Sequence, residues 1–378
     1  MNFFSESEKR RRVAILGATG SIGRNAVRVA QAYSDRIDTV CVSCAHQGKE
    51  LLDIADKLHA RYHYCSEAPE MSNLSDEEAL CEVLAGPGID VVLCAIQGIG
   101  ALKPVMAALR AGKTVCLATK EVLVAAGEWV MKTAKESGGR ILPVDSEHCA
   151  IFQCLRGDDR RALRRIILTC SGGPFHAHPE QDLHTVTLAE ASHHPTWNMG
   201  AKVTLDSATL MNKAFEMMEA AWLYDVPESQ IEVVIHPQAL VHSMVEFVDG
   251  AVLAQLGPTD MRLPIQFCLT YPERFPALMQ TLDFTQPLDL KFFPPDTRRF
   301  PALDLARRAL RMGGLAGAVL NAANDAACRR FREGTLAFDE ITLSVRAALE
   351  QTPVGEADSY PALECAAQVA RDVVDKFR

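Results

Sequence analysis

The stretch Val13-Ala-Ile-Leu-Gly17-Ala-Thr-Gly20-Ser-Ile-Gly23 opens the first regular part of this 378-residue chain. Its apolar beginning predicts a buried strand, and its glycines predict a tight turn that leads into a helix. Gly17 permits the turn, Gly20 lets backbone amides approach an anion, and Gly23 lets the helix pack closely on the strand. This spacing, directly after a first strand, predicts a turn that binds the pyrophosphate of a dinucleotide.

Strands and helices alternate from Val13 to about residue 145. Short apolar runs predict strands at 13–16, 38–43, 91–95, 114–118 and 140–144. Amphipathic stretches between them predict helices at 23–32, 48–59, 77–84 and 104–111. Such alternation is typical of a doubly wound parallel sheet, so we expect a Rossmann-like α/β domain with its ligands at the carboxyl ends of the strands.

The remaining chain mixes both kinds of element. We expect a central α+β region with strands at 166–170, 231–235, 243–247 and 251–256. A helix at Ser207–Tyr224, with Asp206 or Ser207 as its N-cap, belongs to the same region. Prolines indicate an ordered linker next, and a helical pattern then predicts a small bundle. The predicted domains are therefore 1–145, 146–270, 271–300 and 301–378.

Composition excludes some classes of function. The net charge of −9 argues against binding to nucleic acid or to an acidic membrane surface. The sequence contains no apolar run of the ~18 residues that span a bilayer, and its beginning has no signal-peptide core. The 12 cysteines have no regular spacing, and Cys41 and Cys44 lie within a predicted strand. We interpret them as reduced, packed thiols, which predicts a cytoplasmic protein.

The end of the second predicted strand bears on the choice of cofactor. NAD-binding domains place an acidic residue there, against the ribose hydroxyls. Here the segment is Ser43-Cys-Ala-His46-Gln-Gly-Lys49, which has no acid and offers a histidine and a lysine. It favours NADP over NAD, because a 2′-phosphate would be tolerated. The alternative is that Lys49 is a solvated helix residue.

Acidic residues follow the last strand of the first domain. Asp145 and Glu147 are two residues apart, and in extended backbone both would face the same way. Carboxylates that meet at one point need a cation between them, and all-oxygen ligation suits Mg²⁺ or Mn²⁺. A solvated loop edge is the alternative, which the flanking apolar residues disfavour.

The predicted helix at 207–224 suggests a third carboxylate. Asn212 and Glu216 are four residues apart, and Lys213 and Glu216 are three apart, so one helix face carries an amide, an ammonium and a carboxylate. From the spacing alone, an ordinary surface helix is at least as good an interpretation.

Together these segments resemble the 1-deoxy-D-xylulose 5-phosphate reductoisomerase family, from about Val13 to the C-terminus. The segments that carry the resemblance are Gly-Ala-Thr-Gly-Ser-Ile-Gly (17–23), Pro-Val-Asp-Ser-Glu-His (143–148), Ser-Gly-Gly-Pro-Phe (171–175), His-Pro-Thr-Trp-Asn-Met-Gly (194–200), Asp-Ser-Ala-Thr-Leu-Met-Asn-Lys (206–213), His-Ser-Met-Val-Glu-Phe (242–247) and Asn-Ala-Ala-Asn (321–324). Several long motifs in one order are far more specific than a glycine turn.

The resemblance implies roles for individual residues. The divalent metal would be held by Asp145, Glu147 and Glu216. Substrate would be bound or converted by Lys120, Glu121, Ser146, Ser171, His194, Trp197, Met199, Ser207, Asn212 and Lys213. Within that set, the phosphate would be held by Ser171, Ser207, Asn212 and Lys213 with help from His194, and Trp197 and Met199 would belong to a closing lid. The cofactor would contact Gly17, Thr19, Gly20, Ser21, Ile22, Gly23, His46, Lys49, Glu121 and Gly200.

The resemblance also implies an activity. The family converts 1-deoxy-D-xylulose 5-phosphate into 2-C-methyl-D-erythritol 4-phosphate with NADPH and Mg²⁺ or Mn²⁺, with Co²⁺ as a further candidate, in the non-mevalonate route to isoprenoid precursors. Its members are homodimers. The chain departs from the family pattern at Thr119, Ala239, Thr259 and Gly48, which bears on cofactor-phosphate contacts and on the polarity of the site.

Two other functions compete with this one. A plain NADP-dependent dehydrogenase of the semialdehyde type would need a nucleophilic cysteine, for which Cys149 is a candidate, but the acidic pair beside it favours a metal. A non-catalytic NADP-binding sensor or scaffold would leave the carboxylates unexplained.

Overall fold

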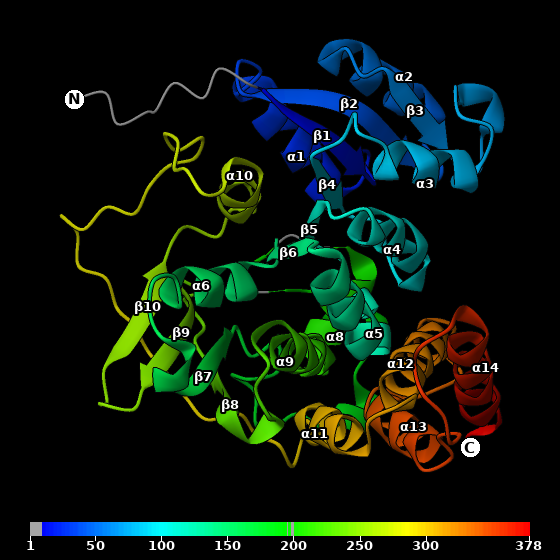
Figure 1. The fold of residues 1–378 in the computed structure, drawn as a ribbon. Helices are drawn as coiled ribbons and strands as arrows, with labels where there is room; N and C mark the ends of the chain where they lie inside the picture. Colours follow the sequence, from blue (N-terminus) through cyan, green and yellow to red (C-terminus); the bar gives the residue numbers. More distant parts are fainter. Residues whose placement is uncertain (1–9, 195, 198–199) are drawn as a thin grey trace. The chain divides into compact units, whose positions relative to one another are not determined.

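The computed structural model describes residues 10–378 except residues 195, 198 and 199 (Figure 1). The chain forms two compact units. The first contains the described residues up to Thr119, Lys132–Asp145 and Asp260–Gln280. The second contains Lys120–Met131, Ser146–Thr259 and Thr281–Arg378.

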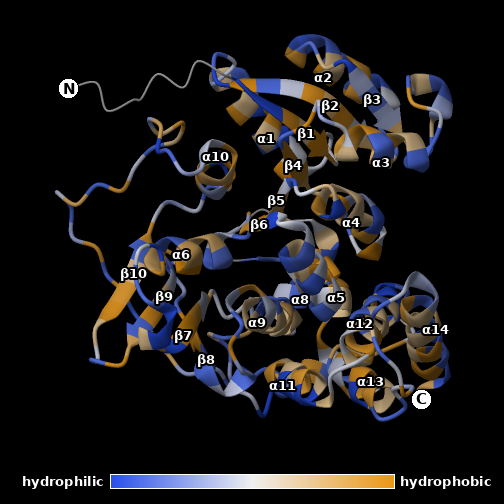
Figure 2. Cartoon of the chain, in the orientation of Figure 1, coloured by the Kyte–Doolittle hydropathy of each residue, from blue (hydrophilic) through white to orange (hydrophobic). Residues whose placement is uncertain are grey.

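The first unit is built on a six-stranded parallel sheet, which confirms the predicted α/β fold. Its strand order is β3-β2-β1-β4-β5-β6. Val13–Leu16 are fully buried at the centre, and Figure 2 shows the hydrophobic character of β1 and β4. The strands are β1 (Arg11–Leu16), β2 (Ile37–Cys44), β3 (Tyr62–Cys65), β4 (Val91–Cys94), β5 (Thr114–Leu117) and β6 (Arg140–Pro143).

Helices cover this sheet. They are α1 (Ser21–Ala32), α2 (Gly48–Leu58), α3 (Glu77–Ala85), α4 (Leu102–Arg110) and α10 (Arg262–Thr270), with short 3₁₀ turns at η1 (Pro69–Met71) and η2 (Ile99–Ala101). Helix α10 packs against α1, β5 and β6. The segment 260–270, which the sequence analysis placed in the central region, therefore lies with the first sheet.

The second unit contains a four-stranded mixed sheet of order β10-β9-β7-β8. Its strands are β7 (Leu163–Cys170), β8 (Ile231–Ile235), β9 (Val241–Phe247) and β10 (Val252–Leu256). Its helices are α6 (Ser146–Cys154), α7 (Leu188–Ala191), α8 (Ala201–Ala208), α9 (Met211–Tyr224), α11 (Ala302–Met312), α12 (Ala316–Arg332), α13 (Glu340–Leu349) and α14 (Tyr360–Lys376), with 3₁₀ turns η3 (Arg160–Ala162), η4 (Leu183–Thr185) and η5 (Glu228–Gln230).

The predicted helix at Ser207–Tyr224 is wrong at its start. Leu210 has a left-handed backbone with φ of 60°, which separates α8 from α9. The predicted caps therefore lie inside α8, and the hydroxyl of Thr209 accepts instead from the amide of Met211 at 3.3 Å.

Helix α5 (Glu121–Ser137) begins in the second unit, where two glycines bring it close to its neighbours. A Cβ on Gly127 would lie 2.2 Å from the Trp222 ring of α9, and a Cβ on Gly317 of α12 would lie 2.0 Å from the carbonyl oxygen of Val124. Both positions require glycine because the space is already filled. In the described part of the chain, no helix combines the length and the apolar character needed to cross a membrane.

Candidate active site

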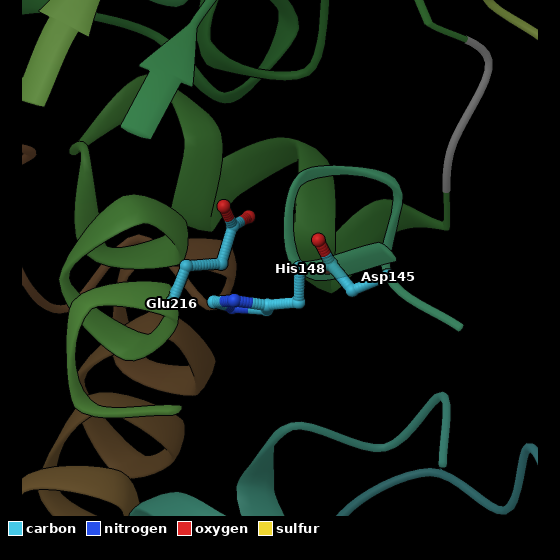
Figure 3. Close-up of side chains that lie close together, drawn as sticks. All are labelled: Asp145, His148 and Glu216. Carbon is cyan, nitrogen blue, oxygen red and sulfur yellow. The ribbon is translucent and has the colours of Figure 1, made fainter. Parts of the chain in front are cut away.

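The predicted extended geometry of Asp145 and Glu147 is wrong. Helix α6 begins at Ser146, so Glu147 lies in its first turn. On a helix, residues three apart share a face, which pairs Asp145 with His148 instead. The ligand atoms of Asp145, His148 and Glu216 lie within 4.8 Å of one another (Figure 3). Asp145 ends the first unit, and its peptide bond to Ser146 ties it to α6.

The polar face of α9 is confirmed, and it is buried. The side-chain amide of Asn212 donates to Glu216 at 2.6 Å, and the ammonium of Lys213 contacts the same carboxylate. Lys213 is 3% exposed and Glu216 is 1% exposed, which excludes an ordinary surface helix.

Two lysines neutralise the carboxylates. Lys213 Nζ donates to Glu147 Oε1 at 2.7 Å as well as to Glu216 Oε2. Lys120 Nζ, just before α5, donates to Glu216 Oε1 at 2.9 Å and to Asn212 Oδ1 at 3.0 Å. The hydroxyl of Ser146 donates to the other oxygen of Glu147. A carboxylate as buried as Glu216 requires such partners, because an unpaired buried charge is strongly destabilising.

A second pair of buried side chains, which was not predicted from the sequence, lies near this cluster. His148 Nε2 lies 3.1 Å from Glu219 Oε2, and both side chains are almost completely buried. The hydroxyl of Tyr224 donates to the carbonyl oxygen of His148 at 2.6 Å. The signal was present in the sequence, because Glu216 and Glu219 are three residues apart on α9.

Ser171 and His194 meet at the end of β7. His194 Nε2 lies 2.9 Å from Ser171 Oγ, and His194 Nδ1 accepts from the amides of Thr196 and Trp197 at 3.2 and 2.9 Å. Burial, with the charge of His193, lowers the pKa of His194 to about 4. The ring is therefore neutral near pH 7, and its remaining N–H donates to Ser171 Oγ. The serine keeps its own hydroxyl hydrogen for an acceptor such as a phosphate oxygen.

The loop after Ser171 lies against the end of α8. Gly173 has a φ of +69°, and a Cβ there would lie 2.7 Å from the carbonyl oxygen of Ser207. This close approach brings the chain segments of Ser171 and Ser207 together. Gly200 is the N-cap of α8. Trp197 is partly buried, with its ring 6.3 Å from that of His242, whereas Met199 lies outside the described residues.

The glycine turn has the predicted form. Gly17 has a φ of +78°, and a Cβ there would lie 2.5 Å from the carbonyl oxygen of Ala95. A Cβ on Gly23 would lie 2.0 Å from the carbonyl oxygen of Gly17. Helix α1 begins after Gly20 with no acidic residue in its first turn, so its amino-terminal end favours an anion. Thr19 is buried within the turn, Ser21 is exposed and Ile22 is partly buried.

The loop after β2 pairs with an acid from another loop, which the sequence pattern does not indicate. His46 Nδ1 lies 2.7 Å from Glu67 Oε2, a residue that follows β3, and Lys49 is exposed on α2. The packing explains the glycine at position 48, because a Cβ there would lie 2.7 Å from the Met71 side chain. Only the pairing of β2 with β3 brings Glu67 to this loop.

A parallel sheet of this order with a glycine turn after β1 defines the class of nicotinamide-dinucleotide-binding oxidoreductase domains. Sequence models of 1-deoxy-D-xylulose 5-phosphate reductoisomerase match residues 13–127 and, for its C-terminal domains, 141–224 and 256–373. The chain therefore belongs to this family of NADPH-dependent oxidoreductases.

Comparisons with individual relatives support the same family. Reductoisomerases of Heliobacterium modesticaldum and Cupriavidus necator are 45% and 44% identical, each over 96% of both chains. The solved Zymomonas mobilis reductoisomerase in complex with NADPH is 38% identical, with a TM-score of 0.89 over 97% of this chain and 98% of that one. Another solved reductoisomerase, which holds NADPH, fosmidomycin and magnesium, is 37% identical, with a TM-score of 0.88 over 97% of each chain.

Proposed function

We propose that this chain isomerises and reduces 1-deoxy-D-xylulose 5-phosphate to 2-C-methyl-D-erythritol 4-phosphate with NADPH, in the non-mevalonate route to isoprenoid precursors. The observation that carries the proposal is the buried cluster in which Lys120 and Lys213 neutralise Glu147 and Glu216. A plain dehydrogenase or a binding module has no need of such a cluster. The relatives solved with NADPH and magnesium support the same conclusion.

Asp145, Glu147 and Glu216 are the proposed ligands of one divalent cation, Mg²⁺ or Mn²⁺ with Co²⁺ as a further candidate. The donor set fits, because carboxylate oxygens suit these ions and because the Lys213 ammonium already bridges two of the three residues as a positive charge. His148 adds a nitrogen donor nearby. When bound, such an ion supplies Lewis-acid polarisation of the substrate carbonyl.

The substrate phosphate is proposed to bind Ser171, Ser207, Asn212 and Lys213, with His194 orienting Ser171. Ser171 is suited to this role because His194 donates to its oxygen, which leaves its hydroxyl hydrogen able to donate to a phosphate oxygen. Unlike the Ser171 hydroxyl, the Lys213 ammonium is already engaged, because it pairs with two glutamates. We propose that Lys213 binds the phosphate once a metal ion compensates the charge of those glutamates. Phosphate contacts would then orient the reacting carbons.

NADPH is proposed to lie with its pyrophosphate on the Gly17–Gly23 turn, beside Thr19, Ser21 and Ile22, and with its 2′-phosphate near His46 and Lys49. Glu121 and Gly200 are proposed as further contacts to the cofactor, and Glu121 and Ser146 as contacts to the substrate. The rearranged aldehyde would accept hydride from the nicotinamide. Closure of a lid that carries Trp197 and Met199 would exclude water from the intermediate.

We also propose a homodimer with β10 at its contact. β10 is an edge strand on which Val252 and Leu253 are 48% and 44% exposed, and Val248 nearby is 68% exposed. In Figure 2 the ribbon of β10 has largely the colour of hydrophobic residues. An apolar edge strand is a site for pairing with a second copy. Light scattering tests the proposed dimer. The unchanged protein should have twice the mass of one chain, and Leu253→Asp should lower the measured mass towards that of a single chain.

A cytoplasmic location is proposed from the cysteines, which are free thiols throughout the described residues and nearly all buried. The division into domains at 1–145, 146–270, 271–300 and 301–378 remains a proposal, and its bounds differ from those of the two compact units at residues 120–131 and 260–280.

Identification of the product tests the proposed function. The purified chain is incubated with NADPH, Mg²⁺ and 1-deoxyxylulose 5-phosphate, and the carbon skeleton of the product is read by NMR. A branched skeleton, formed with one NADPH oxidised per molecule, is expected. An unbranched reduced sugar would indicate a plain dehydrogenase, and NADPH binding without turnover would indicate a sensor.

A further inference from the structure

A second cluster of charges surrounds Lys202 of α8, and Glu121 is its one member that has been given a role above. Lys202 Nζ lies 2.8 Å from Asp206 Oδ2 on the same helix and 3.1 Å from Asp325 Oδ1 on α12. It lies 3.8 Å from Glu121 Oε1, at the start of α5. The same ammonium lies 5.3 Å from the centre of the Phe215 ring on α9. One side chain thus contacts segments from four helices of the second unit.

Asp206 is held on both of its oxygens. Its second oxygen, Oδ1, accepts from the side-chain amide of Asn324 at 2.7 Å and lies 3.6 Å from the thiol of Cys328. Asn324 is completely buried and Asp206 is 3% exposed. The carboxylate therefore fixes α8 to α12 in one position, since a buried carboxylate that loses a partner is strongly destabilised.

The charges in this cluster do not cancel. Three carboxylates face one ammonium, and burial together with Asp206 and Glu121 raises the pKa of Asp325. Burial lowers the pKa of Lys202, but the neighbouring carboxylates outweigh it and the pKa is raised overall. Lys202 is therefore charged at neutral pH, and its removal would leave carboxylates facing one another.

The cluster borders residues proposed to bind substrate. Asp206 directly precedes Ser207, and Glu121 directly follows Lys120. Movement of α8 would displace the serine, and movement of the start of α5 would displace the lysine that donates to Glu216. Displacement of a reacting or binding group by about 1 Å can lower a rate by about 10²-fold.

We infer that Lys202 is a positioning residue. It holds α8 against α5 and α12, and thereby keeps Ser207 and Lys120 in the positions that the substrate requires. The inference rests on the proposed function, because it concerns the same phosphate and carboxylate groups. Lys202 touches neither substrate nor cofactor in this account. Its influence passes through Asp206 and Glu121.

The test compares Lys202→Met and Lys202→Arg with the unchanged enzyme, and uses Lys103→Met as a matched control. Lys103 also pairs with two carboxylates, Glu77 and Glu78, but on the surface of the first unit. We expect Lys202→Met to lower kcat/KM for the sugar phosphate about 10²-fold. The dissociation constant of NADPH, measured by fluorescence without substrate, should change much less than kcat/KM. The glycine turn proposed to hold the pyrophosphate belongs to the other unit, and of the proposed cofactor contacts only Glu121 and Gly200 border this cluster. Lys202→Arg should recover a large part of the loss, and the control should match the unchanged enzyme.

A binding readout separates positioning from loss of stability. The sugar phosphate alone should raise the Tm of the unchanged enzyme, since a ligand stabilises the state that binds it. It should raise the Tm of Lys202→Met much less. If Lys202→Met does not fold, Asp206→Asn replaces it, because the amide keeps the shape and the bond from Asn324 while removing the charge. About a 10-fold loss of kcat/KM is expected for that variant.

Unchanged kcat/KM in a folded Lys202→Met, or in Asp206→Asn, would overturn the inference, as would an equal loss of affinity for NADPH. These outcomes differ from failure of the proposed function. In that case the unchanged enzyme itself would not form the branched product.

Discussion

Lys213 and Glu216 lie three residues apart on α9 and form a buried ion pair, and the same ammonium reaches Glu147 on α6 at 2.7 Å. A lysine thus stands where two proposed metal ligands meet. The carboxylates are compensated without an added ion. If another positive charge took its place, the lysine would become available, and the proposed metal and phosphate sites would then be coupled through this one side chain.

Glu216→Gln should lower kcat by about 10²-fold or more while the protein still folds. Glutamine keeps an oxygen that can accept from Lys120 and Asn212, but it removes the negative charge. Steady-state kinetics and circular dichroism check the two parts of this prediction. A folded variant with full activity would remove Glu216 from the metal site.

Lys213→Ala should raise KM for the sugar phosphate more than KM for NADPH. It also leaves Glu147 and Glu216 without their shared ammonium, so Mg²⁺ should stabilise the variant more than it stabilises the unchanged enzyme. Thermal unfolding with and without Mg²⁺ measures that difference. A change confined to KM for NADPH, or an equal effect of Mg²⁺ on both proteins, would contradict the exchange proposed for this lysine.

His194 should make the protein less stable in mild acid. Its pKa falls from the ordinary 6.5 to about 4 in the folded state, mainly because of burial. The unfolded chain therefore binds more protons between these values, and stability is lost as pH falls from 6.5 towards 4. With screening by solvent, the loss should be roughly 1 kcal/mol. Urea unfolding across this pH range should show a shallower decline for His194→Gln, and an identical decline would refute the assignment.

Gly317→Ala should destabilise the second unit by roughly 1–3 kcal/mol, because the new methyl group would lie 2.0 Å from the carbonyl oxygen of Val124. Activity should fall as well, since Lys120 lies at the start of α5. Gly88→Ala is the control, because a Cβ at Gly88 meets no atom within 4 Å. Equal stability of the two variants would mean that α5 and α12 are not in close contact.

Much of the fold could be predicted because local signals agree with it. The apolar runs and the glycine turn of the first sheet have the right period and order, so its parallel arrangement follows from the sequence. Strand β3 was missed because Tyr-His-Tyr-Cys is short and has little alternation. The place of α10 was missed because its packing on α1 depends on tertiary contacts alone.

The site was predictable where spacing along one helix decides it, as for Asn212, Lys213 and Glu216. It was not predictable where segments distant in the sequence meet. Glu67 reaches His46 only through the pairing of β2 with β3, and Lys202 reaches Asp325 only through the packing of α8 on α12. The geometry of Asp145 and Glu147 was wrong because a helix begins at Ser146 earlier than the apolar pattern indicates.

The proposed function depends on a divalent cation that Asp145, Glu147 and Glu216 would hold. The most direct measurement is oxidation of NADPH with 1-deoxyxylulose 5-phosphate after treatment with EDTA, followed by addition of Mg²⁺ or Mn²⁺. We expect no turnover with EDTA, recovery with either ion, and no recovery for Glu216→Gln. Full turnover in excess EDTA would contradict the need for a cation.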